Sequence, residues 1–258
     1  APSMQYCGFL KSAQLFDNGF FSISPGEAAV MDPQQRLLLE HAYAALHGAS
    51  QSKPLLMGAC VGVYVGVWAC EYQSVLNTSP AGQSVYAATA ATCSVVVGRV
   101  SFVLGMQGPC VSVDTACSSG LAASHAGLRA LQHRECETVL VAGVNMLFSP
   151  EASFMTGLAG MTSPRGRSHT FDVRADGYAR GEACCPAVLQ ASSEKEVAAQ
   201  WRLQGSAVRQ DGKSASLTAP NGSAQRTLLV LALRRAAMSG DMVCGVEAHG
   251  TGTPLGDP

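Results

Sequence analysis

The chain has 258 residues, of which 47% are hydrophobic and 14% are charged, and its formal net charge at pH 7 is −1. So apolar a composition excludes an intrinsically disordered chain, and the absence of any Lys/Arg run gives no support for binding to nucleic acid or to an anionic membrane surface. No stretch of about 20 apolar residues occurs, so we expect no transmembrane helix.

Short β-rich runs alternate with helical patterns, which predicts an α/β protein. Asp32 and Pro33 are typical of a helix start, and Gly48 is typical of its end. In chain order we further expect a strand at Val61–Val67, a helix over Ser84–Leu104, a strand at Cys110–Asp114, a helix at Ser118–Gln132, strands at Thr138–Val144 and Ala187–Gln190, a helix at Gln225–Met238 and a last strand at Val243–Ala248. The polar segment Ser192–Glu196 is the best candidate for a boundary.

The ten cysteines include no C-x-x-C spacing, and a chain of this length does not need disulfide bonds to be stable. We therefore expect reduced, mostly buried thiols and no zinc site. The vicinal pair Cys184 and Cys185 falls in a strand pattern and is expected to be packed. Asp172 and Asp176 lie in a loop pattern, but their spacing fits no set of metal ligands.

Cys117 occupies a position that can make a thiol reactive. The run Val113–Gly120 (VDTACSSG) predicts a strand ending near Asp114 and a helix beginning near Ser118, with Cys117 at the turn between them. The free N–H groups and the positive end of a helix dipole favour a thiolate there, and the same N–H groups can hold an oxyanion. The alternative interpretation is one more small core residue.

His249 follows a strand pattern and opens a loop rich in glycine and threonine. Histidine carries protons near pH 7, and short side chains let a substrate approach the backbone closely. The alternative is an inert, hydrogen-bonded histidine at a strand end. The spacing of 132 residues from Cys117 also fits papain-like proteases, but Ser118 follows the cysteine where that family has Trp or Tyr, which argues against a protease.

Five blocks, in order along nearly the whole chain, resemble the β-ketoacyl synthase (ketosynthase) family in its type I polyketide synthase branch. The blocks are DPQQR at Asp32–Arg36, VDTACSSG at Val113–Gly120, FDVRADGYARGE at Phe171–Glu182, GSAVRQDGKSASLTAPNG at Gly205–Gly222 and VEAHGTGTPLGDP at Val246–Pro258.

The resemblance implies a thiolase-like α/β fold, in which two similar halves stack as αβαβα layers, and a homodimer. It divides the chain into an N-terminal half, 1–191, that carries the nucleophile, and the start of a C-terminal half, 197–258. Asp114 and Glu182 are expected to support loops. The low charge is compatible with a large dimer interface.

The same resemblance implies the chemistry. Cys117 is the implied nucleophile that takes an acyl chain from a phosphopantetheine thiol, and His249 is one of two histidines that assist decarboxylation of a malonyl extender. Thr251 and Thr253 match threonines that hydrogen-bond the pantetheine arm. No cofactor is bound by the domain itself; the implied partners are an acyl carrier protein, a second copy of the chain and other domains of a multidomain synthase, and we expect a cytoplasmic location.

The chain departs from the family's pattern in several places. The second catalytic histidine, a lysine and a Gly/Phe loop follow the last matched block in the family, and a strand segment precedes the region that matches Ala1, so we expect the central piece of a ketosynthase domain, truncated at both ends. Arg209 replaces the usual Asn, and Ala183 the usual Gly, which would strain the backbone if that position needs a positive φ. Two alternatives stay open: a non-condensing acyl-transfer domain and an inactive dimerisation piece.

Overall fold

The computed structural model describes residues 6–68, 71–191, 201–253 and 256. The chain forms two compact units. The first, called here the sheet unit, comprises Gly8–Ala152 and Gly181–Ser192. The second unit comprises Ala1–Cys7, Ser153–Arg180 and Ser193–Pro258. The expected boundary at Ser192–Glu196 lies outside the described residues.

A four-stranded sheet with the strand order β3-β2-β4-β6 forms the centre of the sheet unit. The central strand β2 (Val61–Val67) runs parallel to β3 (Cys110–Val113) and to β4 (Thr138–Asn145), whereas β6 (Ala183–Gln190) runs antiparallel to β4. Every residue of β2 is buried. This explains why its sequence is a continuous apolar run rather than an alternating one, since both of its faces are covered.

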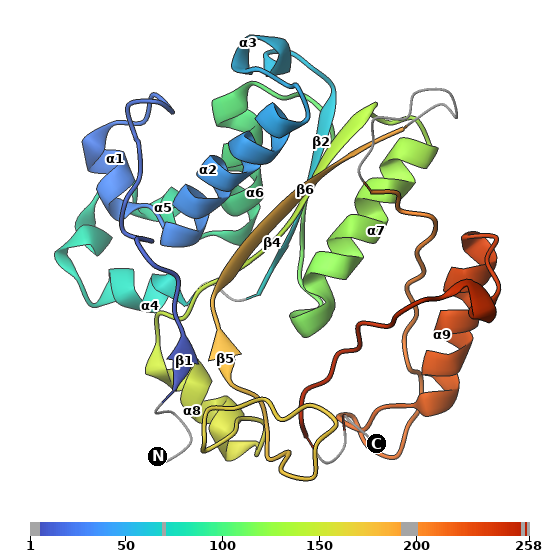
Figure 1. Cartoon of the computed structure of the whole chain (residues 1–258). Helices are drawn as coiled ribbons and strands as arrows, with labels where there is room; N and C mark the ends of the chain where they lie inside the picture. The colour runs from blue at the N-terminus through green and yellow to red at the C-terminus, as the bar shows by residue number, and fades with distance from the viewer. Residues whose placement is uncertain (1–5, 69–70, 192–200, 254–255, 257–258) are drawn as a thin grey trace. The chain divides into compact units, whose positions relative to one another are not determined.

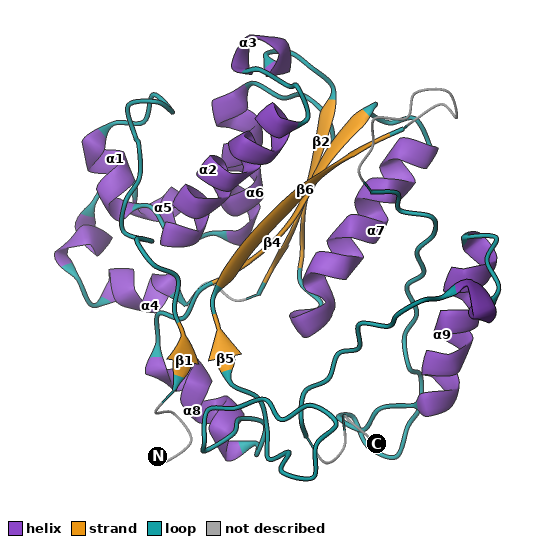
Figure 2. Ribbon diagram, viewed as in Figure 1, coloured by secondary structure: helices purple, strands orange, loops and turns teal. Residues whose placement is uncertain are grey.

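Helices cover both faces of this sheet (Figure 1; Figure 2). Helices α2 (Pro33–Gly48) and α6 (Cys93–Leu104) pack against each other and one face, and α7 (Ser119–Gln132) packs on the other. The larger core lies on the α2 and α6 side and includes Leu38, Leu39, Leu46, Val63, Val65, Val96, Val100, Leu104 and Leu140. The smaller core lies under α7 and includes Tyr64, Ala123, Ala130, Val139 and Val141. The expected α/β class is confirmed.

The remaining elements are short, apart from α9. Among the described residues of the sheet unit they are α1 (Pro25–Val30), α3 (Lys53–Leu56), α4 (Tyr72–Asn77), α5 (Ala87–Ala90) and the 3-10 turns Pro80–Gln83 and Ala116–Ser118. Strands β1 (Cys7–Gly8) and β5 (Arg180–Gly181) pair with each other, and α8 spans Pro150–Leu158. The second unit contains α9 (Gly222–Arg235) and a 3-10 turn at Gly240–Met242.

The helix expected over Ser84–Leu104 is interrupted, and only its second half is a long helix. The break has a tertiary cause. The buried side-chain amide of Gln35 donates to the carbonyl oxygens of Thr89 and Ala90, at 3.1 and 2.9 Å, and the backbone N–H of Asp32 also donates to Ala90 at 2.9 Å. These carbonyls are therefore bonded to α2, so α5 ends at Ala90 and α6 starts again at Cys93.

The strand expected at Val243–Ala248 was wrong: no regular element forms there, and Val246 is 81% exposed. A strand needs a neighbouring strand to bond its backbone, and within the described ranges none pairs with this segment. Strand β6 begins at Ala183, earlier than expected, and Pro186 fits because β6 is an edge strand. Helix α9 begins early because Asn221 caps it, accepting from the N–H groups of Ser223 and Ala224.

The expectation that most cysteines are buried was also wrong. Among the described cysteines only Cys136 is buried, and five are exposed: Cys60, Cys110, Cys117, Cys185 and Cys244. Two of these lie on the edge strands β3 and β6, which explains their exposure. All the described cysteines are free thiols, and Cys184, packed on the core beside Leu-rich α2, has a pKa raised to about 12 by burial. No helix in the described part of the chain has both the length and the apolar character needed to cross a membrane.

Candidate active site

Cys117 lies in the 3-10 turn that joins β3 to α7, and its side chain is exposed. The turn is bonded to itself through its hydroxyl side chains. Ser119 Oγ accepts from the N–H of Thr115 at 2.9 Å and donates to the carbonyl of Ala116 at 2.7 Å. Ser118 Oγ donates to the carbonyl of Thr115 at 2.9 Å. Both serines that follow the cysteine therefore fix the turn in place.

Ala116, directly before Cys117, has a φ of +53°. A left-handed conformation costs an alanine about 1–2 kcal/mol, so the surrounding structure must compensate for it. Part of the compensation comes from Asp114, whose carboxylate accepts from the N–H of Ala116 at 3.0 Å. Asp114 thus has the loop-supporting role expected of it, and Cys117 is presented on a strained turn.

Three glycines bring the start of α7 against the sheet. A Cβ on Gly66 of β2 would lie 2.4 Å from the carbonyl carbon of Ser119 and 2.5 Å from the N of Gly120. A Cβ on Gly143 of β4 would lie 3.7 Å from the Cα of Gly120. The turn that carries Cys117 is therefore seated at the carboxyl ends of β2 and β4, at a distance that only glycine in β2 permits.

His249 lies in the second unit, in an exposed segment without regular structure. The two glycines that follow it, Gly250 and Gly252, have φ values of +53° and +66°. Their carbonyl oxygens accept from Thr170 Oγ1 at 2.7 Å and from the N–H of Gly177 at 2.8 Å. The loop after His249 is therefore shaped by glycine and held by the 170–177 segment.

The structure brings Thr251 and Thr253 together. Their hydroxyl oxygens lie 2.9 Å apart at hydrogen-bond distance, and the N–H of Gly256 donates to Thr253 Oγ1 at 3.1 Å. A Cβ on Gly256 would clash with both hydroxyls, at 2.3 and 2.7 Å. Two hydroxyls therefore sit side by side within four residues of His249. The remaining residues of the last matched block, 254–255 and 257–258, lie outside the described residues.

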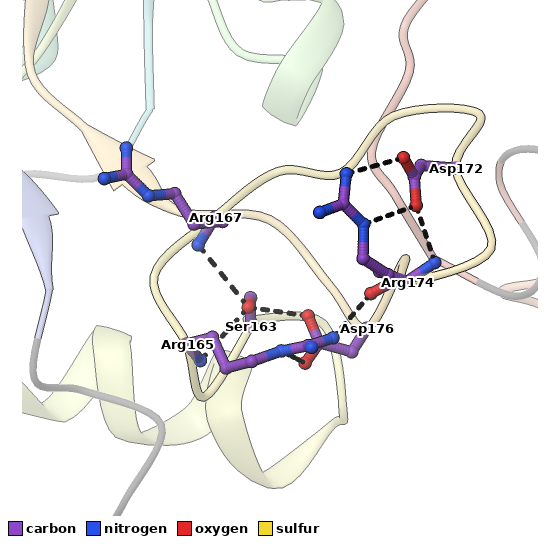
Figure 3. Close-up of polar contacts among 6 residues, drawn as sticks. All are labelled: Ser163, Arg165, Arg167, Asp172, Arg174 and Asp176. Carbon is purple, nitrogen blue, oxygen red and sulfur yellow. Dashed lines mark hydrogen bonds and ion pairs between the residues drawn. The ribbon is translucent and has the colours of Figure 1, made fainter.

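The aspartates considered as metal ligands form ion pairs instead (Figure 3). Asp172 binds the guanidinium of Arg174 through both carboxylate oxygens, at 2.9 and 2.8 Å, and these hydrogen bonds hold its pKa well below the usual range. Asp176 accepts from the buried Ser163 hydroxyl at 2.6 Å and pairs with Arg165 at 2.9 Å, and the bond from Ser163 is the main reason that its pKa is lowered. Among the described residues no group of three or more His, Cys, Asp or Glu side chains is placed to hold a metal ion.

Comparisons with known proteins identify the family of the chain. The family model for the N-terminal domain of β-ketoacyl synthases matches residues 2–195, and that for the C-terminal domain matches residues 201–258. The chain belongs to the β-ketoacyl synthase family.

Curated relatives of this ketosynthase chain are parts of large synthases. Two different phenolphthiocerol/phthiocerol polyketide synthase subunits of Mycobacterium tuberculosis are each 45% identical to it over 97% of this chain. The chain spans only 12% and 16% of the length of these two relatives.

Solved structures of ketosynthases share the fold. The ketosynthase from module 6 of the bacillaene synthase of Bacillus subtilis is 33% identical with a TM-score of 0.86, over 96% of this chain and 43% of that one. An oxazolomycin ketosynthase domain of Streptomyces albus is 33% identical with a TM-score of 0.87, over 98% and 45%. The fold class is therefore the thiolase-like α/β fold of the ketosynthases.

Two positions need comment: Ala183, where the family usually has Gly, and the start of α2, whose burial the sequence does not indicate. Ala183 begins β6 without a positive φ, so the Ala in place of Gly does not strain the backbone. The DPQQR block was matched only as a motif, but Asp32, Gln34 and Gln35 are almost fully buried. Gln34 accepts from the N–H of Met146 and Gln35 donates to the carbonyl of Ala90, both distant in sequence. Polar residues at the start of an amphipathic helix give no sign of such burial in the sequence.

Proposed function

We propose that the chain is a condensing ketosynthase of polyketide biosynthesis, with Cys117 as its nucleophile. One observation carries the proposal: an exposed thiol stands on a strained, self-bonded turn between the edge strand β3 and helix α7, in a chain of this family. A nucleophile needs this kind of access, because the carbonyl it attacks must come within about 3–3.5 Å of the sulfur.

In the proposed acylation step, the Cys117 thiolate attacks the carbonyl carbon of an acyl thioester carried on phosphopantetheine. A new thioester forms at Cys117, and the pantetheine sulfur leaves and takes up a proton. In the condensation step, a malonyl group on an acyl carrier protein loses carbon dioxide. The resulting carbanion attacks the carbonyl carbon of the Cys117 thioester. The bond between this carbon and the Cys117 sulfur breaks, the Cys117 thiolate is released, and the product is a β-ketoacyl thioester on the carrier protein.

His249 is proposed as one of two histidines that assist the decarboxylation, and Thr251 and Thr253 as hydrogen-bond partners of the pantetheine arm. The loop's glycines favour these roles, because they let a substrate arm approach the backbone, and the adjacent hydroxyls offer donors and acceptors to the amides of pantetheine. The proposed partners are an acyl carrier protein, a second copy of the chain and other synthase domains, with a cytoplasmic location. The proposed halves are 1–191 and 197–258.

Intact mass tests the acylation step. The protein that carries this chain is incubated with an acyl thioester of N-acetylcysteamine, beside the variants Cys117→Ala and Cys110→Ala. Cys110 is a matched control because it is an exposed thiol on the strand that precedes the turn. We expect one acyl adduct on the parent and on Cys110→Ala and none on Cys117→Ala; an equal adduct on Cys117→Ala would refute the assignment.

Release of labelled carbon dioxide from malonyl carrier protein tests the decarboxylation step. We expect His249→Ala to release it about 100-fold more slowly while Cys117 is still acylated, since general acid–base groups contribute about 10²–10⁴-fold. Unchanged release from His249→Ala would remove this histidine from the mechanism.

A further inference from the structure

Four consecutive backbone N–H groups directly after β4 all donate to side chains. Met146 donates to Gln34 Oε1 at 3.2 Å, and Leu147 donates to Glu182 Oε1 at 3.0 Å. Phe148 and Ser149 both donate to Glu71 Oε2, each at 3.0 Å. We call residues 146–149 the clamped loop. Backbone N–H groups in loops are usually bonded to backbone or water, so a run of four held by side chains is unusual.

The clamp is built from three segments distant in sequence. Gln34 is 112 positions from its partner, Glu71 is 77 and 78 positions away, and Glu182 is 35 positions away. Gln34 is itself fixed, because its side-chain N–H donates to the buried carboxylate of Asp32 at 3.1 Å. Glu182 also accepts from the N–H of Leu10 at 2.8 Å, through its other oxygen. The two glutamates accept three of the four N–H groups of the loop.

A second contact ties the same stretch of chain to the loop. Tyr72, the residue after Glu71, meets Phe148 with ring centroids 5.3 Å apart and an interplanar angle of 61°, an edge-type aromatic contact. The start of α4 therefore holds Phe148 by its backbone through Glu71 and by its ring through Tyr72.

The clamped loop lies at the same edge of the sheet as the Cys117 turn. Strands β2, β3 and β4 are parallel, so their carboxyl ends share one edge. Gly143, three residues before the loop, lies close to Gly120, three residues after Cys117: a Cβ on Gly143 would be 3.7 Å from the Cα of Gly120. All these residues belong to the sheet unit. The end of β4, just before the clamped loop, therefore lies against the start of α7, just after Cys117.

From this placement we infer that Glu71 is a positioning residue for the acylation of Cys117, acting through the backbone of Phe148 and Ser149. The inference rests on the proposed function, since it needs Cys117 to be acylated. Glu71 fixes a wall beside the thiol, and an acyl thioester is held in line with the sulfur only when that wall is in place. Loss of the two bonds lets the wall move and lowers the fraction of encounters that lead to reaction.

The acceptor geometry predicts which substitutions are tolerated. Both N–H groups bond to one oxygen, so Glu71→Gln keeps the reach and one carbonyl oxygen and satisfies the clamp without a charge. Glu71→Asp keeps the charge but withdraws the carboxylate by one methylene, and Glu71→Ala removes the acceptor altogether. The length of the side chain, and not its charge, therefore sets the expected order of acylation rates. Glu71→Gln should be acylated faster than Glu71→Asp, and Glu71→Asp faster than Glu71→Ala.

The test uses the protein that carries this chain and two reactions at Cys117. One is acylation by an acyl thioester of N-acetylcysteamine, and the other is alkylation by iodoacetamide, which is too small to need the wall; both are followed by mass at the Cys117 peptide. Glu137→Ala is the matched control, because Glu137 is an exposed glutamate at the opposite end of β4.

We expect Glu71→Ala to be acylated about 10- to 100-fold more slowly than the parent, while its alkylation rate stays within about twofold. Glu71→Gln and Glu137→Ala should stay within about threefold in both reactions. Equal acylation of Glu71→Ala and the parent, or an equal fall in both reactions, would overturn the inference. If Glu71→Ala does not fold, Glu71→Asp against Glu71→Gln decides, and acylation of Asp as fast as Gln would overturn it. A parent that is alkylated but never acylated would instead refute the proposed function, and the inference with it.

Discussion

Replacing Gly66 by alanine should push the Cys117 turn away from the sheet. The new methyl group would lie 2.4 Å from the carbonyl carbon of Ser119, 2.5 Å from the N of Gly120 and 2.7 Å from the carbonyl oxygen of Ser119. All three atoms belong to the backbone, so no side chain can swing away. Since ordinary contacts begin near 3.4 Å, the start of α7 must retreat by about 1 Å.

Two consequences of this shift can be estimated. Overpacking of a dense core costs about 1–3 kcal/mol, and an obstruction by backbone on a central strand belongs at the upper end, so we expect the free energy of unfolding to fall by about 2–3 kcal/mol. For a chain of this length that lowers Tm by about 4–12 °C. Because the turn moves with α7, the acylation rate of Cys117 should fall by about 10- to 100-fold.

Thermal unfolding by circular dichroism and acyl adduct formation by mass measure the two effects. Gly98→Ala is the matched control: Gly98 lies inside α6, and a Cβ there meets nothing within 4 Å. Alanine is favoured over glycine in a helix interior, so the control should gain up to about 1 kcal/mol. If Gly66→Ala had the stability and acylation rate of Gly98→Ala, the close seating of α7 on β2 would be refuted.

Three further changes have expected outcomes. Burial raises the pKa of Asp32 to about 6 from 3.8, so the folded state holds this proton more tightly than the unfolded state. The contribution of Asp32 to the free energy of unfolding is therefore greatest below about pH 4 and falls by about 3 kcal/mol as pH rises through about 6; urea unfolding of the parent and of Asp32→Asn should differ by this pH-dependent amount, and a difference that does not change with pH would contradict it. The buried guanidinium of Arg99 donates to Gln35 Oε1 at 2.6 Å and pairs with Glu27. Arg99→Met should therefore lower the free energy of unfolding by about 3 kcal/mol in the same urea assay, and an unchanged value would show that this network does not stabilise α1 on α6. Asn221→Ala should destabilise α9 by about 1 kcal/mol through loss of its cap, measured by hydrogen exchange of the α9 amides, with Asn221→Ser retaining protection and equal exchange in both counting against the cap.

Elements fixed by local signals were predictable from the sequence. Helix α2 has Asp32 as its cap and Pro33 in its first turn, and β2 is a short continuous run of valine, tyrosine and glycine, so both were confirmed with their expected bounds. The turn at Cys117 was also predictable from local signals, because a strand pattern ends and a helix pattern begins within four residues. The break in the expected helix at Ala90 was not predictable from the sequence. It is caused by the side-chain amide of Gln35, which lies 54 and 55 positions before the two carbonyl groups that it binds.

Features that depend on residues distant in the sequence could not be predicted from it. A strand pattern at Val243–Ala248 says nothing of whether a neighbour pairs with it. The positive φ of Ala116 and the fit of Gly66 against Ser119 follow from how α7 meets the sheet, not from the residues near them. Glu71 carries no local sign of its role, because its partners follow β4, 77 and 78 positions along the chain.

Formation of a carbon–carbon bond tests the central claim most directly. The protein that carries this chain is supplied with an acyl thioester and malonyl carrier protein, and the acyl group on the carrier protein is identified by mass. We expect a β-ketoacyl group two carbons longer than the one supplied, and its loss in Cys117→Ala. A parent that is acylated at Cys117 and yields no such product, or a Cys117→Ala variant that yields as much of it, would show that the chain is not a condensing ketosynthase that uses Cys117.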